Sequence, residues 1–327
     1  MELQNLAKEI DAELVGDNHQ VINGFSSNVQ DENKILFISS KKHIPEKYHQ
    51  YGAILTSYEL SELFKNCNLL LSENPKLAFS FLTKLFTTES SEPKIDNNNS
   101  HKNLMLGKNI TLGKNIKFGS NVVINDGVKI GDNSVIGHNV VIHRDCVIKK
   151  NVVIDSGTII GSEGFGNILD RNKKWSHICH AGKVIIDDNV LIGSNCCIDR
   201  GTIEDTIISS GVIMDNLVHI AHNVSIGENT AIAAKVGIAG SCVIGKRNMI
   251  GGMVGIVDHI TTADDVIISA TSTVHKDIKK PGLYTGILPI LEHANWKRIA
   301  FWISKLDKIA KLINYRKNKN HDSNEYQ

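Results

Sequence analysis

Two histidines three residues apart, His219 and His222, stand in the stretch HIAHNVSIG, which otherwise alternates aliphatic, small and turn-forming residues. A third, His259, follows in VDHIT, and Gly240 ends the stretch VGIAG between them. Imidazole can bind a metal ion, accept a proton near neutral pH, or lie unused on a surface. The backbone that carries these histidines decides which of the three applies.

The composition bounds the class of protein. The chain has 327 residues, enough for two domains, and 41% of them are hydrophobic, enough to bury a core. Its 36 Lys and Arg balance 35 Asp and Glu, which argues against a nucleic-acid binder. No apolar run is long enough to span a membrane and the N-terminal MELQNLAKEIDAEL lacks the basic start of a signal peptide, so we expect a soluble, cytoplasmic protein. The six cysteines form no CxxC pair, which favours reduced thiols over disulfides or zinc ligands.

The histidines lie inside a six-residue repeat that begins at Leu106 and continues, with interruptions, toward Val274. Each unit starts with an aliphatic residue, as in LGKNIT and IGHNVV, and carries a small or β-branched residue at its fifth place. About 25 units can be counted, and such a period is typical of a solenoid whose coils bury apolar faces against each other. A strand plus a corner fits one unit, and three units close one triangular coil. Three cysteines fall at the inward fifth place and are predicted to pack in the core: Cys146, Cys196 and Cys242.

Two segments break the period. Residues 161–183, GSEGFGNILDRNKKWSHICHAGK, are polar and contain several glycines, which predicts a loop leaving the coil. A long loop on a rigid solenoid often carries function, and a tolerated insertion is the plain alternative. Residues 199–207, DRGTIEDTI, shift the phase one coil before His222.

The segments on either side lack the repeat. Apolar spacing predicts helices at residues 1–14 and 74–86 and strands at 34–39 and 52–57, hence a small α/β domain followed by a polar linker at 87–103. After Pro281-Gly282 stops the repeat, residues 290–315 have the apolar spacing of a helix. Eight Lys or Arg against one acidic residue lie between Trp296 and Asn320. This charge fits either a solvated helix face or the docking of an acidic protein.

Several motifs together resemble one family. They are SEGFG at 162–166, IDRG at 198–201, EDTI at 204–207, MDN at 214–216, IAHNVSIG at 220–227, VGIAG at 236–240 and PGLYTG at 281–286. They are similar to motifs of the UDP-3-O-acylglucosamine N-acyltransferases of lipid A biosynthesis, which are hexapeptide-repeat acyltransferases. The resemblance implies a left-handed parallel β-helix with a small N-terminal α/β domain and a C-terminal helical segment. It divides the chain into a uridine-binding domain and linker at 1–100, a β-helix acyltransferase domain at 104–282 with a loop insertion at 161–183, and a helical extension at 283–327.

Members of that family are homotrimers that transfer a 3-hydroxyacyl chain from acyl carrier protein to the 2-amine of UDP-3-O-acylglucosamine, giving UDP-2,3-diacylglucosamine. They form no acyl-enzyme and need no metal. The resemblance therefore implies no cofactor and no metal in this chain, because the phosphopantetheine that holds the acyl donor belongs to acyl carrier protein. The partners it implies are acyl carrier protein, the sugar nucleotide and further copies of the chain, with no nucleic acid and at most a peripheral proximity to the membrane.

Carried over by motif, His222 takes the general-base position, Gly240 offers a backbone N–H to the developing oxyanion, and His259 is the second active-site histidine. The repeat agrees with this grouping, because Gly240 lies one coil and His259 about two coils beyond His222, with strands ~4.8 Å apart. Amide formation from a thioester needs a group that takes a proton from the amine, and imidazole suits that role. Glu204 or Asp205, about one coil before His222, is a candidate for orienting its ring.

Substrate contacts are also implied by the resemblance. Relatives carry F-x-x-N-x-x-Y, whose aromatic residues sandwich uracil, and here the matching residues are Phe37, Ser40 and His43. The amide and the tyrosine are thus replaced by a serine that can still hydrogen-bond and an imidazole that can still stack. Three further residues are expected to contact substrate: Asp215, Asn216 and Lys276.

His219 is expected on the surface, because it lies outside the matched AHN motif and a strand histidine of this kind usually faces solvent. Side chains three residues apart on one strand tend to opposite faces. The same spacing argues against a zinc site at His219 and His222. Two other functions stay open: another hexapeptide-repeat enzyme, either a UDP-N-acetylglucosamine O-acyltransferase or an acetyl-CoA-dependent sugar-nucleotide N-acetyltransferase, and a noncatalytic solenoid scaffold. The N-terminal domain and the IDRG motif argue against the O-acyltransferase, and histidines that share one edge argue against the scaffold.

Overall fold

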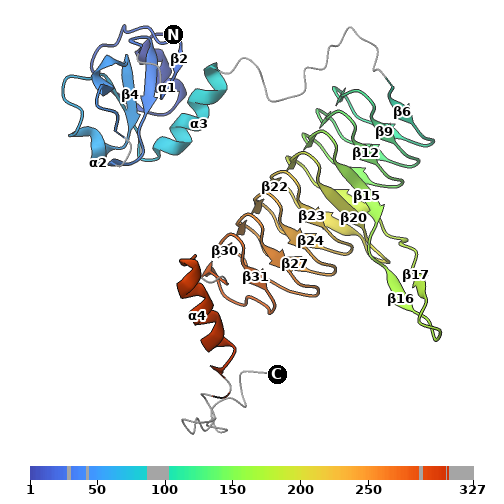
Figure 1. Cartoon of the computed structure of the whole chain (residues 1–327). Coiled ribbons are helices and arrows are strands. Elements are labelled where there is room, and N and C mark those ends of the chain that lie inside the picture. The colour runs from blue at the N-terminus through green and yellow to red at the C-terminus, as the bar shows by residue number, and fades with distance from the viewer. Residues whose placement is uncertain (28–30, 42–43, 87–102, 287–289, 307, 309–327) are drawn as a thin grey trace. The chain divides into compact units, whose positions relative to one another are not determined.

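The computed structural model describes residues 1–27, 31–41, 44–86, 103–286, 290–306 and 308. The chain forms two compact units, Met1–Pro93 and Lys94–Gln327, drawn in Figure 1. His43 and most of the predicted linker lie outside the described residues.

The N-terminal unit is a five-stranded sheet with helices. Strand order is β1-β5-β4-β3-β2, and all neighbours are parallel except β1 and β5. Its elements are α1 (Leu3–Glu9), β1 (Glu13–Val15), β2 (Gly24–Phe25), β3 (Lys34–Phe37), the 3-10 helix η2 (Tyr48–Gln50), β4 (Ala53–Thr56), α2 (Tyr58–Ser61), β5 (Leu69–Leu71) and α3 (Pro75–Phe86).

The predicted helix at 1–14 is too long by one turn. It ends at Glu9, and Asp11 has a left-handed φ of 52°, so the chain reverses and Glu13 pairs with Leu71 as an antiparallel edge strand. The other predicted elements of this unit are confirmed by β3, β4 and α3.

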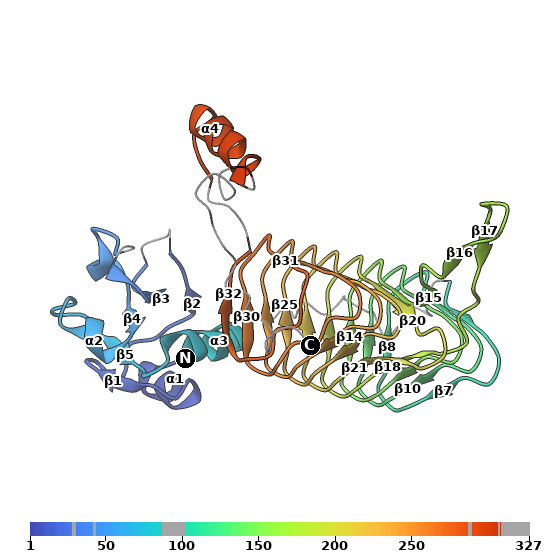
Figure 2. The same cartoon turned by 90° about the horizontal axis from the view of Figure 1, so that it is seen from below.

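The second unit is a parallel β-helix with three faces, seen along its length in Figure 2. Face A holds β7 (Thr111–Leu112), β10 (Lys129–Ile130), β13 (Val147–Ile148), β18 (Val184–Ile186), β21 (Thr206–Ile208), β24 (Ser225–Ile226) and β27 (Val243–Ile244). Face B holds β8 (Lys117–Phe118), β11 (Val135–Ile136), β14 (Val153–Ile154), β19 (Leu191–Ile192), β22 (Ile213–Met214), β25 (Ala231–Ile232), β28 (Met249–Ile250), β30 (Val266–Ile268) and β32 (Gly282–Tyr284). Face C holds β6 (Met105–Leu106), β9 (Val123–Ile124), β12 (Val141–Ile142), β15 (Ile159–Glu163), β20 (Cys197–Arg200), β23 (His219–Ile220), β26 (Gly237–Ile238), β29 (Gly255–Ile256) and β31 (Thr273–Val274).

The six-residue period explains this shape. The first and fifth residues of each unit point inward, as Ile124 at 1% and Val122 at 0% exposure illustrate. The fourth residue makes the corner in the left-handed region, with φ of 56° at Asn109 and 57° at Asn115, which asparagine tolerates better than most residues. The predicted fold class, a left-handed parallel β-helix with a small N-terminal α/β domain and a C-terminal helical segment, is confirmed.

The inward cysteines confirm the predicted phase of the repeat. Cys146, Cys196 and Cys242 are all 0% exposed within the β-helix core. Burial raises the pKa of the Cys146 thiol to about 11, so this thiol stays protonated and inert at neutral pH.

A change of register marks the segment where the repeat fails. Val135 pairs with Val153 one coil further along the chain, but Ile159 pairs with Cys197, beyond a long extra segment, because the chain leaves the coil between β15 and β18. That excursion contains an antiparallel hairpin, β16 (Asn167–Leu169) and β17 (Trp175–His177), which projects from the coils in Figure 1. The predicted loop is therefore partly a strand pair.

The C-terminal helix is α4 (His293–Ile303), shorter than the predicted 290–315. Residues 309–315 lie outside the described part of the chain. Within the described ranges, no helix has the length and apolar character needed to cross a membrane.

Candidate active site

The corner that follows each strand of face C, called here the C edge, carries the proposed chemistry. His222 follows β23, Gly240 follows β26 and Asp258 follows β29, at equivalent places one coil apart. These residues line a hollow of about 600 Å³.

The ring of His222 is oriented by Asn223. The Asn223 Nδ2 donates to the Glu204 carbonyl at 2.9 Å, so its Oδ1 is the acceptor end. His222 Nδ1 lies 3.0 Å from that Oδ1 and 3.5 Å from Thr202 Oγ1. Nδ1 therefore carries the hydrogen, and Nε2 keeps a free lone pair, as a general base requires.

Gly240 lies directly against this ring. A Cβ at Gly240 would be 2.7 Å from His222 Nε2 and 2.5 Å from Cε1, so only glycine fits here. At the equivalent place on the same edge, the Lys108 N–H donates to Asp126 Oδ1 at 2.7 Å. Among the described residues the Gly240 N–H has no such acceptor, which leaves it available beside Nε2.

The rest of the hollow is made of small and apolar residues. Glycine or alanine occupies outward places where the coils elsewhere carry larger side chains, and this opens a groove along face C. The lining residues of this kind are Ala221, Gly237, Ile238, Ala239, Gly255, Ile256 and Val257. Such a groove suits an acyl chain.

His219 was expected on the opposite face from His222, and this expectation is wrong. Both histidines line the same hollow, because the chain turns the corner after Ile220 and swings His222 round beside the outward-facing His219. The His219 Nε2 lies 3.7 Å from Oδ2 of Asp199, which is only 6% exposed and accepts from Ser162 Oγ at 2.7 Å.

The excursion from the coil packs over the site. A Cβ at Gly164 would be 3.1 Å from His222 Cδ2, and Phe165 lines the hollow while 77% exposed. His180 packs edge-on against the same ring, with 5.4 Å between ring centroids. Residues 161–183 thus form one wall of the site.

The sequence suggested that Glu204 or Asp205 orients the His222 ring, but in the structure neither of them does so. The Glu204 backbone carbonyl accepts from Asn223, and Asp205 Oδ1 accepts from the Lys183 N–H at 3.0 Å. The phase slip at 199–207 moves both carboxylates out of register. Asn223, directly after the histidine in the AHN motif, was the signal that the sequence analysis overlooked.

His259 is offset from the predicted place. It occupies the left-handed corner position with φ of 59°, as Asn223 does, while Asp258 is the residue in register with His222. The His259 side chain is exposed, and among the described residues it is Asp258 that lines the hollow. The backbone N–H of His259 donates to the Gly240 carbonyl at 3.0 Å, which supports that glycine.

The predicted substrate residues are spread over both units. Lys276 is exposed on the C edge, three strands beyond β23, whereas Asp215 and Asn216 follow β22 at another corner. Within one chain these two do not line the hollow, and Asn216 Oδ1 accepts from the Ser194 N–H at 2.7 Å.

Phe37 and Ser40 lie in the N-terminal unit. Phe37 ends β3 half-buried and stacks on Phe79, with ring centroids 4.4 Å apart and planes 8° apart. One face of the Phe37 ring is thus covered by Phe79. Ser40 is half-buried close after the same strand.

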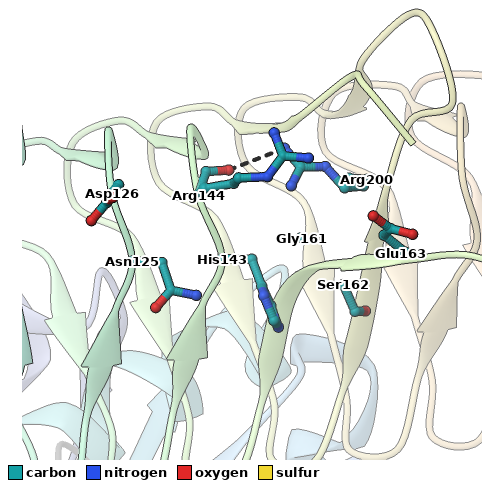
Figure 3. Close-up of a pocket in the computed structure, with 8 residues that line it drawn as sticks. All are labelled: Asn125, Asp126, His143, Arg144, Gly161, Ser162, Glu163 and Arg200. Carbon is teal, nitrogen blue, oxygen red and sulfur yellow. Dashed lines mark hydrogen bonds between the residues drawn. The ribbon is translucent and has the colours of Figure 1, made fainter. Parts of the chain in front are cut away.

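A second hollow of about 540 Å³ lies along the C edge on the other side of the excursion (Figure 3). Arg200, 2% exposed, donates through Nη2 to the Arg144 carbonyl and through Nε to the Gly182 carbonyl. Burial lowers the pKa of this guanidinium from its ordinary value. Glu163 lines the same hollow, and its hydrogen bond with His177 lowers the pKa of its carboxyl.

Comparison with known proteins gives consistent matches. Residues 109–144 match the family model described as bacterial transferase hexapeptide (six repeats). A protein from Bordetella avium named UDP-3-O-acylglucosamine N-acyltransferase is 46% identical over 158 residues, which are 47% of this chain and 44% of that protein. One of the same name from Albidiferax ferrireducens is 42% identical over 155 residues, 47% of each chain. The match thus spans less than half the length of these curated relatives, and their name agrees with the resemblance that the motifs indicate.

Solved structures agree on the fold. The UDP-N-acetylglucosamine acyltransferase from Campylobacter jejuni matches with a TM-score of 0.52 and 20% identity, over 67% of this chain and 92% of that one. The enzyme from Francisella novicida matches with the same TM-score and 23% identity, over 67% and 80%. At this identity the likeness concerns the β-helix alone.

Proposed function

We propose that the chain is an acyl carrier protein-dependent N-acyltransferase. It transfers a 3-hydroxyacyl group to the 2-amine of UDP-3-O-acylglucosamine, giving UDP-2,3-diacylglucosamine for lipid A. The observation that carries this proposal is that His222 Nε2, left as a lone pair by Asn223, lies beside Gly240, whose N–H has no acceptor among the described residues, in an apolar groove. The names of the relatives support the substrate and reaction.

The reaction is a direct transfer. The sugar amine attacks the thioester carbonyl, forming the C–N bond, while His222 Nε2 accepts the proton that the amine loses. Negative charge on the carbonyl oxygen is stabilised by the Gly240 N–H, a contribution of roughly 3 kcal/mol for a preorganised donor. The intermediate then collapses, the C–S bond breaks, and the imidazolium returns its proton to the departing thiolate of phosphopantetheine. None of these steps uses a metal or an acyl-enzyme.

Binding of the two substrates uses other surfaces. Phe37 supplies the ring face for uracil in the N-terminal unit, and the groove of small residues along face C holds the acyl chain. Acidic acyl carrier protein docks on the basic residues near the C-terminal end, among them Lys276, Lys297 and Arg298. Three copies of the chain form the trimer, and Asp215 and Asn216 contact substrate bound against a neighbouring copy.

The test is product analysis. Purified chain is incubated with a ladder of 3-hydroxyacyl carrier protein thioesters and either UDP-3-O-acylglucosamine or UDP-N-acetylglucosamine, and the products are weighed by mass spectrometry. An amide product from the amino sugar only, with one chain length preferred, is expected. An ester formed on UDP-N-acetylglucosamine would instead identify an O-acyltransferase, and no product from either would favour the noncatalytic scaffold.

A further inference from the structure

Three side chains at the base of the excursion bring ligand atoms together. Glu163 ends β15, His177 ends β17 and His180 lies in the returning segment, and one ligand atom from each lies within 4.8 Å of the others. The resemblance implies no metal, and the spacing that disfavours zinc applies to a different pair of histidines. We propose that Glu163, His177 and His180 bind Zn²⁺.

His180 provides the strongest reason. Its side chain is 0% exposed, yet its Nε2 has no hydrogen-bond partner among the described residues. A buried polar atom without a partner is costly and rare. The Nδ1 lies 3.0 Å from the Ile178 carbonyl, which can only accept, so Nδ1 carries the hydrogen. Nε2 is therefore a lone pair in a buried place, which is the form of histidine that a metal ion binds.

His177 reaches the same arrangement once an ion replaces the hydrogen that its Nε2 donates to Glu163. Its Nε2 lies 2.5 Å from Glu163 Oε2, while its Nδ1 lies 3.4 Å from Asn167 Oδ1. Both histidines thus have an oxygen acceptor at Nδ1, the outer contact that commonly fixes metal-binding imidazoles. A simple ion pair would explain Glu163 and His177 but would leave His180 Nε2 without a partner.

The donor set selects the metal. Two imidazoles and one carboxylate form a common zinc set, with ligand bonds of about 2.0–2.2 Å and a fourth place for water. Magnesium and calcium prefer oxygen ligands. Glu163 and His177 have side chains 42% and 46% exposed, so they can move inward toward the buried His180. The nearby arginines, Arg144 and Arg200, oppose another positive charge, and we expect weaker binding than at a closed four-ligand site (Figure 3).

Such an ion would fasten the excursion to the coil. It would join the end of β15 to the end of β17, on either side of Gly164 and Phe165, which form the wall beside His222. Zinc binding here is independent of the acyl-transfer reaction and can be measured without it.

The first experiment measures zinc itself. Full-length protein without an affinity tag is stripped with chelator, equilibrated with zinc sulfate, desalted and analysed for metal per chain. We expect one zinc per chain in the wild type and at least a tenfold weaker Kd in His177→Ala and Glu163→Gln, whose side chains are exposed enough for the fold to persist. His180→Gln should behave likewise. His275→Ala, an exposed histidine on the same edge, is the matched control and should keep its zinc.

The second experiment follows the hairpin. Zinc should slow amide hydrogen exchange in β16 and β17 of the wild type and have no effect in His177→Ala, because the ion adds a link from the end of β17 to Glu163 and His180 that this variant cannot form. Equal zinc retention by the wild type and His177→Ala would overturn the proposal. So would loss of zinc in His219→Ala but not in His177→Ala, since the ion would then lie in the acyl-transfer hollow.

Discussion

Asn223 sets the chemistry of the residue before it. Its side-chain oxygen accepts from His222 Nδ1, while its own amide donates to the Glu204 carbonyl. This is the role that a carboxylate plays in many acid–base pairs, here performed by a neutral group that occupies the left-handed corner of the coil. A neutral partner leaves the imidazole oriented without adding charge to the groove.

This role can be separated from a structural one by two substitutions. Asn223→Gly removes the acceptor but accepts the left-handed φ of 59°, and we expect kcat to fall about 10- to 100-fold with KM little changed. Asn223→Asp keeps an oxygen facing Nδ1 and should recover most of the activity. Steady-state kinetics with the acyl carrier protein thioester distinguishes a role in orienting His222 from a purely structural role. Equal losses in both variants would assign Asn223 to corner packing only.

Of all the residues in the site, we expect His222 to have the largest effect on kcat. His222→Ala should lower kcat by about two to four orders of magnitude through loss of the general base, and leave the fold intact because the ring is half-buried at a corner. His219→Ala removes only a partner of Asp199 and should change kcat far less. Circular dichroism checks the fold of both. Near wild-type turnover in His222→Ala would refute the acyl-transfer mechanism.

Gly240 offers a sharp steric test. In Gly240→Ala the new Cβ would lie 2.5 Å from His222 Cε1, so the ring or the corner must move, and we expect kcat to fall by about 100-fold or more. Gly252→Ala, at the equivalent place after β28 and outside the hollow, meets no atom closer than 3.4 Å and should keep kcat within about threefold. Comparable kcat in the two variants would mean that contact with His222 at this place does not matter to the reaction.

At the scale of elements, the repeat made the coils predictable because each six-residue unit encodes both its inward residues and its corner. The segments that lack this repeat were harder to predict from the sequence. The hairpin of β16 and β17 lies in a polar stretch with no alternation, and only its pairing across the turn makes it a strand pair. The prediction that His219 and His222 point to opposite faces was wrong for a related reason, because the alternation of side chains along a strand does not continue round a corner. Sequence motifs found His222 and Gly240, but contacts across coils, such as that of Gly164 with His222, needed the structure.

The basic C-terminal elements should act as a docking surface. Reversing the charge of Lys297, Arg298 and Lys305 should raise KM for the acyl carrier protein donor and weaken its dependence on salt, with kcat unchanged, because screened attraction governs encounter more than chemistry. Lys108→Glu, Lys114→Glu and Lys129→Glu together make the matched control at the first coils of the β-helix. An unchanged KM at low salt, or an equal rise in the control, would remove this surface from the proposal.

At the scale of the molecule, the proposed function places uracil recognition and acyl transfer in different units. The N-terminal unit has its own core, with Leu3, Ile35 and Leu70 fully buried. If this unit holds the nucleotide, a substitution in its binding surface should raise KM for the sugar nucleotide. The same substitution should leave kcat unchanged. Because an effect on KM can be measured separately from an effect on kcat, uracil binding can be tested directly.

Phe37→Ala is that test. It removes the ring whose one face is covered by Phe79, and if stacking on uracil contributes roughly 1 to 3 kcal/mol, KM for the sugar nucleotide should rise by about one to two decades. The substitution also removes a packing contact, so stability must be controlled. Phe25→Ala is suited to this, because Phe25 packs against the same Phe79 with ring centroids 5.3 Å apart. We expect both variants to lose thermal stability and only Phe37→Ala to lose affinity for UDP-3-O-acylglucosamine, measured by KM and by binding of UDP alone. A similar loss of affinity in both, or a fall in kcat without a change in KM, would make Phe37 part of the core of its unit and place uracil elsewhere.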